Sequence, residues 1–66
     1  MKLSRAAKAA IKKYGRDACV HAHHVHTVIG EGASTIANCY PINGVNTTRQ
    51  ADAAINAGRE LAEGAA

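Results

Sequence analysis

The first segment of the chain places apolar and basic residues with the period of a helix. Its apolar residues recur every three or four positions, namely Leu3, Ala7, Ile11 and Tyr14, and residues with that spacing share one side of a helix. Gly15 follows directly and suits the left-handed conformation that ends many helices. The pattern predicts a helix over residues 3–14.

The middle of the chain changes to runs rich in β-branched residues. Residues 18–29 include Val20, Val25 and Val28, and residues 34–41 form a second such run beyond the Gly30–Gly32 turn. Two β-rich runs around a glycine turn are typical of a β-hairpin. We therefore expect two strands, over about residues 18–29 and 34–41, paired antiparallel.

The last segment returns to helical spacing. Thr47 is followed three residues later by Gln50, which matches a capping box at a helix N-terminus. Beyond it Ala51, Ala54, Ile55 and Gly58 recur on one side. A second helix is predicted over residues 48–62.

These elements predict a small α+β domain spanning residues 1–66. Their order is α-β-β-α, with an antiparallel hairpin packed by two amphipathic helices. The chain has 66 residues and contains no Phe or Trp, and a domain of this size buries only about 60% of its unfolded surface. We expect the thin core to be completed by self-association, as a dimer or a higher oligomer.

The sequence carries no sign of a membrane segment. No stretch approaches the roughly 20 apolar residues that a membrane helix requires, and charged residues interrupt the N-terminal region where a signal peptide would be apolar. The two cysteines are too few for a disulfide scaffold. We expect a cytoplasmic protein with reduced thiols and no membrane partner.

Positive charge is concentrated at the start of the chain. Six cations precede the first acidic residue, Asp17: Lys2, Arg5, Lys8, Lys12, Lys13 and Arg16. On a helix they gather opposite the apolar side, where they would follow the phosphates of a nucleic acid or dock on an acidic protein surface. The alternative is a solvated face that keeps a small protein soluble.

Four histidines lie within six residues, at positions 21, 23, 24 and 26. On the predicted strand His21 and His23 share one face, and a hairpin centred on Glu31 places Cys39 opposite His23. Imidazole and thiolate are common zinc ligands, so His21, His23 and Cys39 are the candidate zinc site. Two alternatives stay open: the imidazoles are hydrogen-bonded fillers on the sheet, or they line an interface that loosens at acidic pH.

Catalysis has weaker support than binding. A Cys39 nucleophile with His23 or His24 as base has the residue types of thiol catalysis. However, a domain this small offers little wall for a substrate pocket, and no carboxylate is placed to orient the base. We therefore predict no catalytic residues and no resident cofactor, with zinc as the only candidate.

Size and composition favour a non-catalytic binding protein. Short chains with a minimal core are typical of inhibitor-type accessory proteins of phages and mobile elements, including those that block host defence complexes, and such proteins act through protein–protein contacts. Two alternatives remain: a nucleic-acid-binding protein that uses the basic helix, and a zinc-binding protein that uses the histidine-rich segment.

Overall fold

The computed structural model describes residues 2–40 and 42–64, and every regular element in these residues is helical. They are α1 (Arg5–Tyr14), α2 (Arg16–His24), the π-helical turn η1 (Val25–Ile29), α3 (Ala33–Cys39) and α4 (Thr48–Ala62). The predicted α+β fold is therefore wrong. So is its antiparallel hairpin, because helices occupy both of the segments expected to be strands; residue 41, at the end of the second, lies outside the described residues.

Residues 18–29 are helical because their buried positions follow a helical spacing. Cys19, Ala22 and Val25 are fully buried, and their spacing of three residues places them on one side of a helix. The β-branched residues that suggested a strand are mostly on the opposite, exposed side. Tertiary packing of the small buried stripe thus overrides β propensity.

The second expected strand is a short helix for the same reason. Ile36 is fully buried in α3, and Ala33, Ala37 and Tyr40 pack against the core around it at helical spacing. Gly30 has a φ of 91°, a left-handed conformation that glycine adopts without penalty, and its N–H donates to the carbonyl of Val25. The glycine turn therefore separates two helices rather than two strands.

The first helix is fixed at its N-terminus by contacts with the last one. Ser4 Oγ accepts a hydrogen bond from the N–H of Ala7 at 3.1 Å, so Ser4 is the N-cap and α1 begins two residues later than predicted. The carboxylate of Glu60 in α4 accepts hydrogen bonds from Ser4 N at 2.8 Å and from Ser4 Oγ at 2.6 Å. We call these two hydrogen bonds the Ser4–Glu60 clasp, and they join the start of α1 to the last part of α4.

The last helix has the predicted bounds and the predicted cap. Gln50 N donates to Thr47 Oγ1 at 3.2 Å, and Thr47 N donates to Gln50 Oε1 at 3.1 Å. Both halves of the capping box are therefore present, and they satisfy backbone donors that the first helical turn leaves free.

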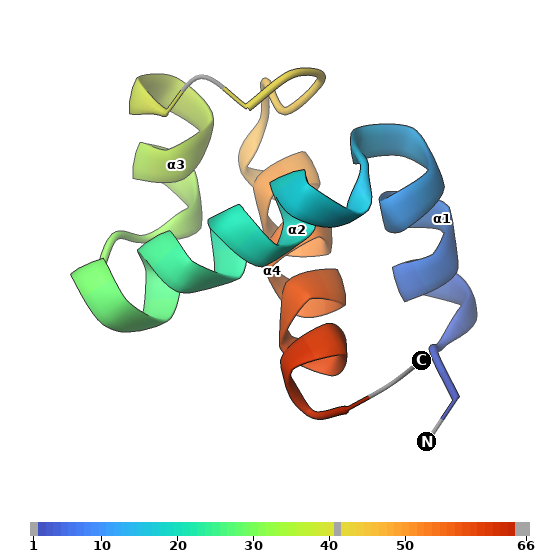
Figure 1. Cartoon of the computed structure of the whole chain (residues 1–66). Coiled ribbons are helices and arrows are strands. Elements are labelled where there is room, and N and C mark those ends of the chain that lie inside the picture. Colours follow the sequence, from blue (N-terminus) through green and yellow to red (C-terminus); the bar gives the residue numbers. More distant parts are fainter. Residues whose placement is uncertain (1, 41, 65–66) are drawn as a thin grey trace.

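Helix α4 is the centre of the fold. Figure 1 shows α2 crossing α4, with α1 and α3 on either side of the crossing, and α4 contacts all three. Its buried residues are almost all small: Ala51, Ala54, Ile55, Ala57 and Gly58. This composition lets the neighbouring helices approach α4 closely.

The closest approach is at Gly58. A Cβ atom at this position would collide with the backbone carbonyl group of Cys19, whose carbon would be 2.8 Å away, and with the Cβ of His23 at 2.6 Å. Only glycine therefore fits where α2 crosses α4. Gly58 is thus a contact point between the two helices.

Candidate functional site

Helix α1 presents its cations on the side that faces away from the core. Ala7 and Ala10 are buried against the rest of the molecule. Arg5, Lys8 and Lys12 are exposed, and their spacing of three and four residues places them in one row opposite the buried alanines. From Arg5 to Lys12 the row rises by seven steps along the helix, or about 10 Å at 1.5 Å per residue.

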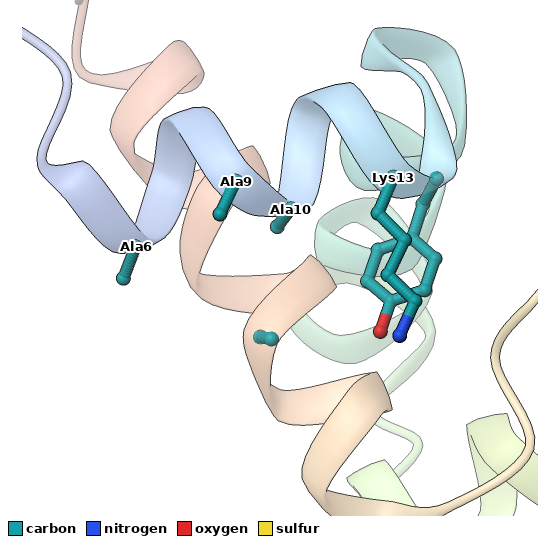
Figure 2. Close-up of a pocket in the computed structure, with 6 residues that line it drawn as sticks. Ala6, Ala9, Ala10 and Lys13 are labelled. Atoms are coloured by element: carbon teal, nitrogen blue, oxygen red, sulfur yellow. The ribbon is translucent and has the colours of Figure 1, made fainter.

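The other three predicted cations are also exposed. Two lie beyond the ends of the row and one lies beside it. Lys2 is exposed just before α1, and Arg16 is exposed at the first position of α2. Lys13 leaves α1 beside the alanines of a shallow hollow (Figure 2), with Nζ 5.4 Å from the centroid of the Tyr14 ring. We call the whole set the basic face: Lys2, Arg5, Lys8, Lys12, Lys13 and Arg16.

Among the residues that the structure describes, no carboxylate forms an ion pair with the basic face. Within residues 2–40 and 42–64 the ion pair that forms joins Arg59 to Glu63 across one turn of α4 at 3.0 Å, and neither residue belongs to the face. Adjacent like charges on a helix repel one another. The basic face is therefore a surface of uncompensated positive charge, available to an anionic partner.

The hollow beside Lys13 is small and apolar. It has a volume of about 270 Å³ and lies between α1 and α4, lined by Ala6, Ala9, Ala10, Lys13, Tyr14 and Ala53 (Figure 2). These six residues include no carboxylate, thiol or imidazole. The hollow can hold an apolar group next to the Lys13 cation.

The four histidines lie on a helix and not on a strand. His21 and His24 are exposed, whereas His23 is half-buried beside Gly58. His26 is exposed, and its Nδ1–H donates to the carbonyl oxygen of Glu31 at 2.9 Å. The cluster is therefore divided between two sides of α2 and η1.

The structure does not bring His21, His23 and Cys39 together as the strand register predicted. Residues two apart in a helix are about 200° apart around its axis, so His21 and His23 diverge. Cys39 is exposed at the end of α3. Among the described residues no three His, Cys, Asp or Glu side chains are grouped closely enough to hold a metal ion, so this set forms no site within one chain.

The two thiols differ in environment. Both are free, and Cys19 is fully buried in the core while Cys39 is exposed. Burial raises the pKa of the Cys19 thiol above its ordinary value, which disfavours the reactive thiolate. Cys39 is the accessible thiol. Among the described residues, the hydrogen bond formed by a histidine ring joins His26 to Glu31, and none joins an imidazole to Cys39.

Sequence reasoning missed an exposed apolar stripe along α2 and η1. Val20, Val28 and Ile29 are 46%, 69% and 55% exposed. Val20, His24 and Val28 are each four residues apart, the spacing of one side of a helix. Helical rather than alternating periodicity was the signal that would have found this stripe.

No family model, curated protein or solved structure is significantly similar to this chain. None of the helices in the described residues is long and apolar enough to cross a membrane. The exposed surfaces that distinguish the chain are the basic face and the exposed side of α2 and η1, with its histidines and apolar residues.

Proposed function

We propose that the chain is a non-catalytic binding protein that holds nucleic acid through its basic face. The observation that carries the proposal is the exposed row of Arg5, Lys8 and Lys12 on α1, which has no carboxylate partner among the described residues. A cytoplasmic location, where nucleic acid is accessible and thiols stay reduced, is part of this proposal.

The row matches the charge density of a nucleic acid backbone. Each strand of double-stranded DNA carries one negative charge per about 3.4 Å, so the three cations in a row of about 10 Å face roughly three phosphate charges of one strand. Lysine and arginine bind phosphate without reading sequence, whereas bases are read mainly by bidentate arginine, asparagine or glutamine contacts in a groove. We therefore expect binding that is largely independent of sequence.

Salt dependence tests this proposal directly. Each phosphate contact lowers the slope of log K against log salt by about 0.9, so four to six contacts weaken binding on the order of 100- to 1,000-fold between 50 and 200 mM salt. Fluorescence anisotropy with a labelled 20-base-pair duplex and a single-stranded RNA measures this slope. Absence of binding to either probe at 50 mM salt would refute the proposal.

Charge reversal localises the contact. We expect Lys8→Glu and Lys12→Glu each to weaken binding at least tenfold at 50 mM salt and to make the salt slope shallower. Arg49→Glu is the matched control, because Arg49 is exposed on α4 outside the basic face and the change in net charge is the same. An equal loss of affinity in the control would mean that net charge, and not the basic face, governs binding.

A second candidate function is supported by the apolar tip of η1. Val28 and Ile29 are more than half exposed, and exposed apolar side chains that cluster favour protein–protein contacts. An inhibitor-type accessory protein of a phage or mobile element would use such a tip to dock on a partner protein. Purification from the cells that make the chain tests it: a partner retained by the wild type and by Lys8→Glu, but lost by the Val28→Ser/Ile29→Ser variant, would support this function over nucleic acid binding.

A further inference from the structure

His21 and His24 form a pair of open metal ligands on the exposed side of α2. They are three residues apart in a regular helical segment, so their Cβ atoms are about 5–6 Å apart on one side. The same i, i+3 spacing is used by the Glu-x-x-His ligand pairs of helical metal sites. Both side chains are exposed, so an ion can reach them from solvent.

The ring nitrogens of this pair are not engaged elsewhere. Neither imidazole forms a hydrogen bond with another described residue, and His21 only meets the ring of Tyr40 edge-on, with centroids 6.5 Å apart. A neutral imidazole with a free nitrogen is the preferred ligand for Zn²⁺. Asp17 lies one turn before His21 on the same side and adds negative charge near the pair.

The other two histidines are less suited to act together. His23 is half-buried against the α2–α4 crossing, and the Nδ1–H of His26 is held by the carbonyl of Glu31. The backbone also changes from α-helix to π-helix between them, which alters the angle between successive side chains. Of the four histidines, only His21 and His24 are both exposed and on the regular α-helix α2.

Two ligands fill half of a tetrahedral zinc shell, and the described residues supply no third ligand nearby. A second copy of the chain can supply the other two ligands of the zinc ion. Val20 and Val28 lie four residues before and after His24, so two antiparallel copies of this stripe place each Val20 against Val28 of the second copy and bring the two His24 side chains together. Such a self-complementary contact is the form that a two-fold symmetric dimer requires.

We propose that His21 and His24 from two copies of this chain bind one Zn²⁺ ion and thereby hold a symmetric dimer. The valines flanking the ion provide the apolar contact around it. This inference is independent of nucleic acid binding, because the basic face lies on α1, on Lys2 before it and on the first residue of α2.

The experiment is native mass spectrometry and sedimentation velocity of the untagged chain at pH 7.5, with and without zinc chloride. Imidazole is mostly neutral above its ordinary pKa of about 6.5, so this pH favours metal binding. We expect a monomer without zinc and a dimer carrying one zinc ion per two chains with it. Chelator should restore the monomer.

Two matched double variants locate the site. We expect His21→Ala/His24→Ala to abolish the zinc-dependent dimer, or to raise the zinc concentration needed for it at least tenfold. His23→Ala/His26→Ala should retain the dimer, and both variants should keep the wild-type helical circular dichroism, because alanine favours helix.

The other results overturn the proposal. They are a wild type that binds no zinc, a monomer that binds zinc one to one, a dimer that needs no zinc, and a dimer abolished by His23→Ala/His26→Ala but not by His21→Ala/His24→Ala. A Val20→Ser/Val28→Ser variant that dimerises with zinc as well as the wild type does would refute the antiparallel arrangement specifically.

Discussion

Replacing Gly58 with alanine should destabilise the protein, although the change improves intrinsic helix propensity. In an unconstrained helix interior, alanine is more favourable than glycine by about 1 kcal/mol. At position 58 the added Cβ would be 2.6 Å from the Cβ of His23 and 2.8 Å from the carbonyl carbon of Cys19. Carbon atoms pack best at about 3.5–4.0 Å, so α2 and α4 must separate by roughly 0.7–0.9 Å to relieve these contacts.

That separation affects the main contact of the fold. The crossing is backbone against backbone, so no side-chain rotation relieves it, and a gap of this size forfeits a quarter to a half of the dispersion energy of the atoms concerned. Overpacking of a well-packed core costs typically 1–3 kcal/mol. Taking the upper end, because backbone must move, and subtracting the propensity gain leaves a net loss of about 2 kcal/mol.

Thermal and urea unfolding followed by circular dichroism at 222 nm measure this loss. For a domain of this size, a loss of about 2 kcal/mol lowers Tm by roughly 8–16 °C. Asn56→Ala is the control, because Asn56 is exposed on the same helix and gains propensity without a clash. If Gly58→Ala instead raises stability by about 1 kcal/mol, propensity governs this position and the close approach of α2 and α4 is refuted.

Two further predictions concern the Ser4–Glu60 clasp and the thiols. Ser4→Ala should lower the free energy of unfolding by about 1 kcal/mol through loss of the N-cap, as measured by urea unfolding; an unchanged midpoint would contradict that role. Hydrogen bonds from the Ser4 side chain and backbone hold the pKa of Glu60 below its ordinary value of 4.5, so the clasp stabilises the fold above that value and is lost as pH falls through the lower, folded-state pKa. Stability curves of the wild type and of Glu60→Gln should therefore differ at neutral pH and converge under acid conditions, and a constant difference would exclude this linkage. A thiol reagent such as 5,5′-dithiobis(2-nitrobenzoate) should modify one thiol rapidly and the other only on unfolding, with the fast phase absent from Cys39→Ser; rapid loss of both thiols in native protein would show that Cys19 is not buried.

The parts of the fold that the sequence predicted correctly are those with strong local signals. Thr47 and Gln50 identify the start of α4 because a capping box is a contact between neighbouring residues, and its geometry is nearly independent of the rest of the chain. The first helix was also found, since its apolar and basic residues separate cleanly. Its N-cap at Ser4 is also a local contact, with Ala7, and was overlooked, whereas the contact of Ser4 with Glu60, 56 residues away, leaves no local pattern.

The middle of the chain was predicted wrongly because its two signals conflict. β-Branched residues favour a strand, whereas the small residues Cys19 and Ala22, together with Val25, recur at helical spacing. Which signal prevails depends on whether a partner helix can approach closely enough to bury a stripe of small residues. Gly58 provides that opportunity, and no local pattern around residues 18–29 reveals it.

The exposure of the basic row was predictable, and the pairing of His21 with His24 was not. A row of cations at helical spacing is exposed in almost any fold, so Arg5, Lys8 and Lys12 follow from sequence alone. The candidate set of His21, His23 and Cys39 depended on strand alternation. On a helix the same residues are separated, and His24, which the strand placed on the opposite face, becomes the neighbour of His21.

The central position of α4 has a consequence for how the chain is made. Helices α1 and α2 find their main contacts on the last fifteen-residue helix, Thr48–Ala62, so during translation the earlier segments have emerged before their packing partner has been synthesised. Folding of this unit then waits until α4 has been synthesised and has left the ribosome, because domains generally fold as units. A message truncated before codon 48 yields a product without a core, exposed to proteases, rather than a smaller working version of the protein.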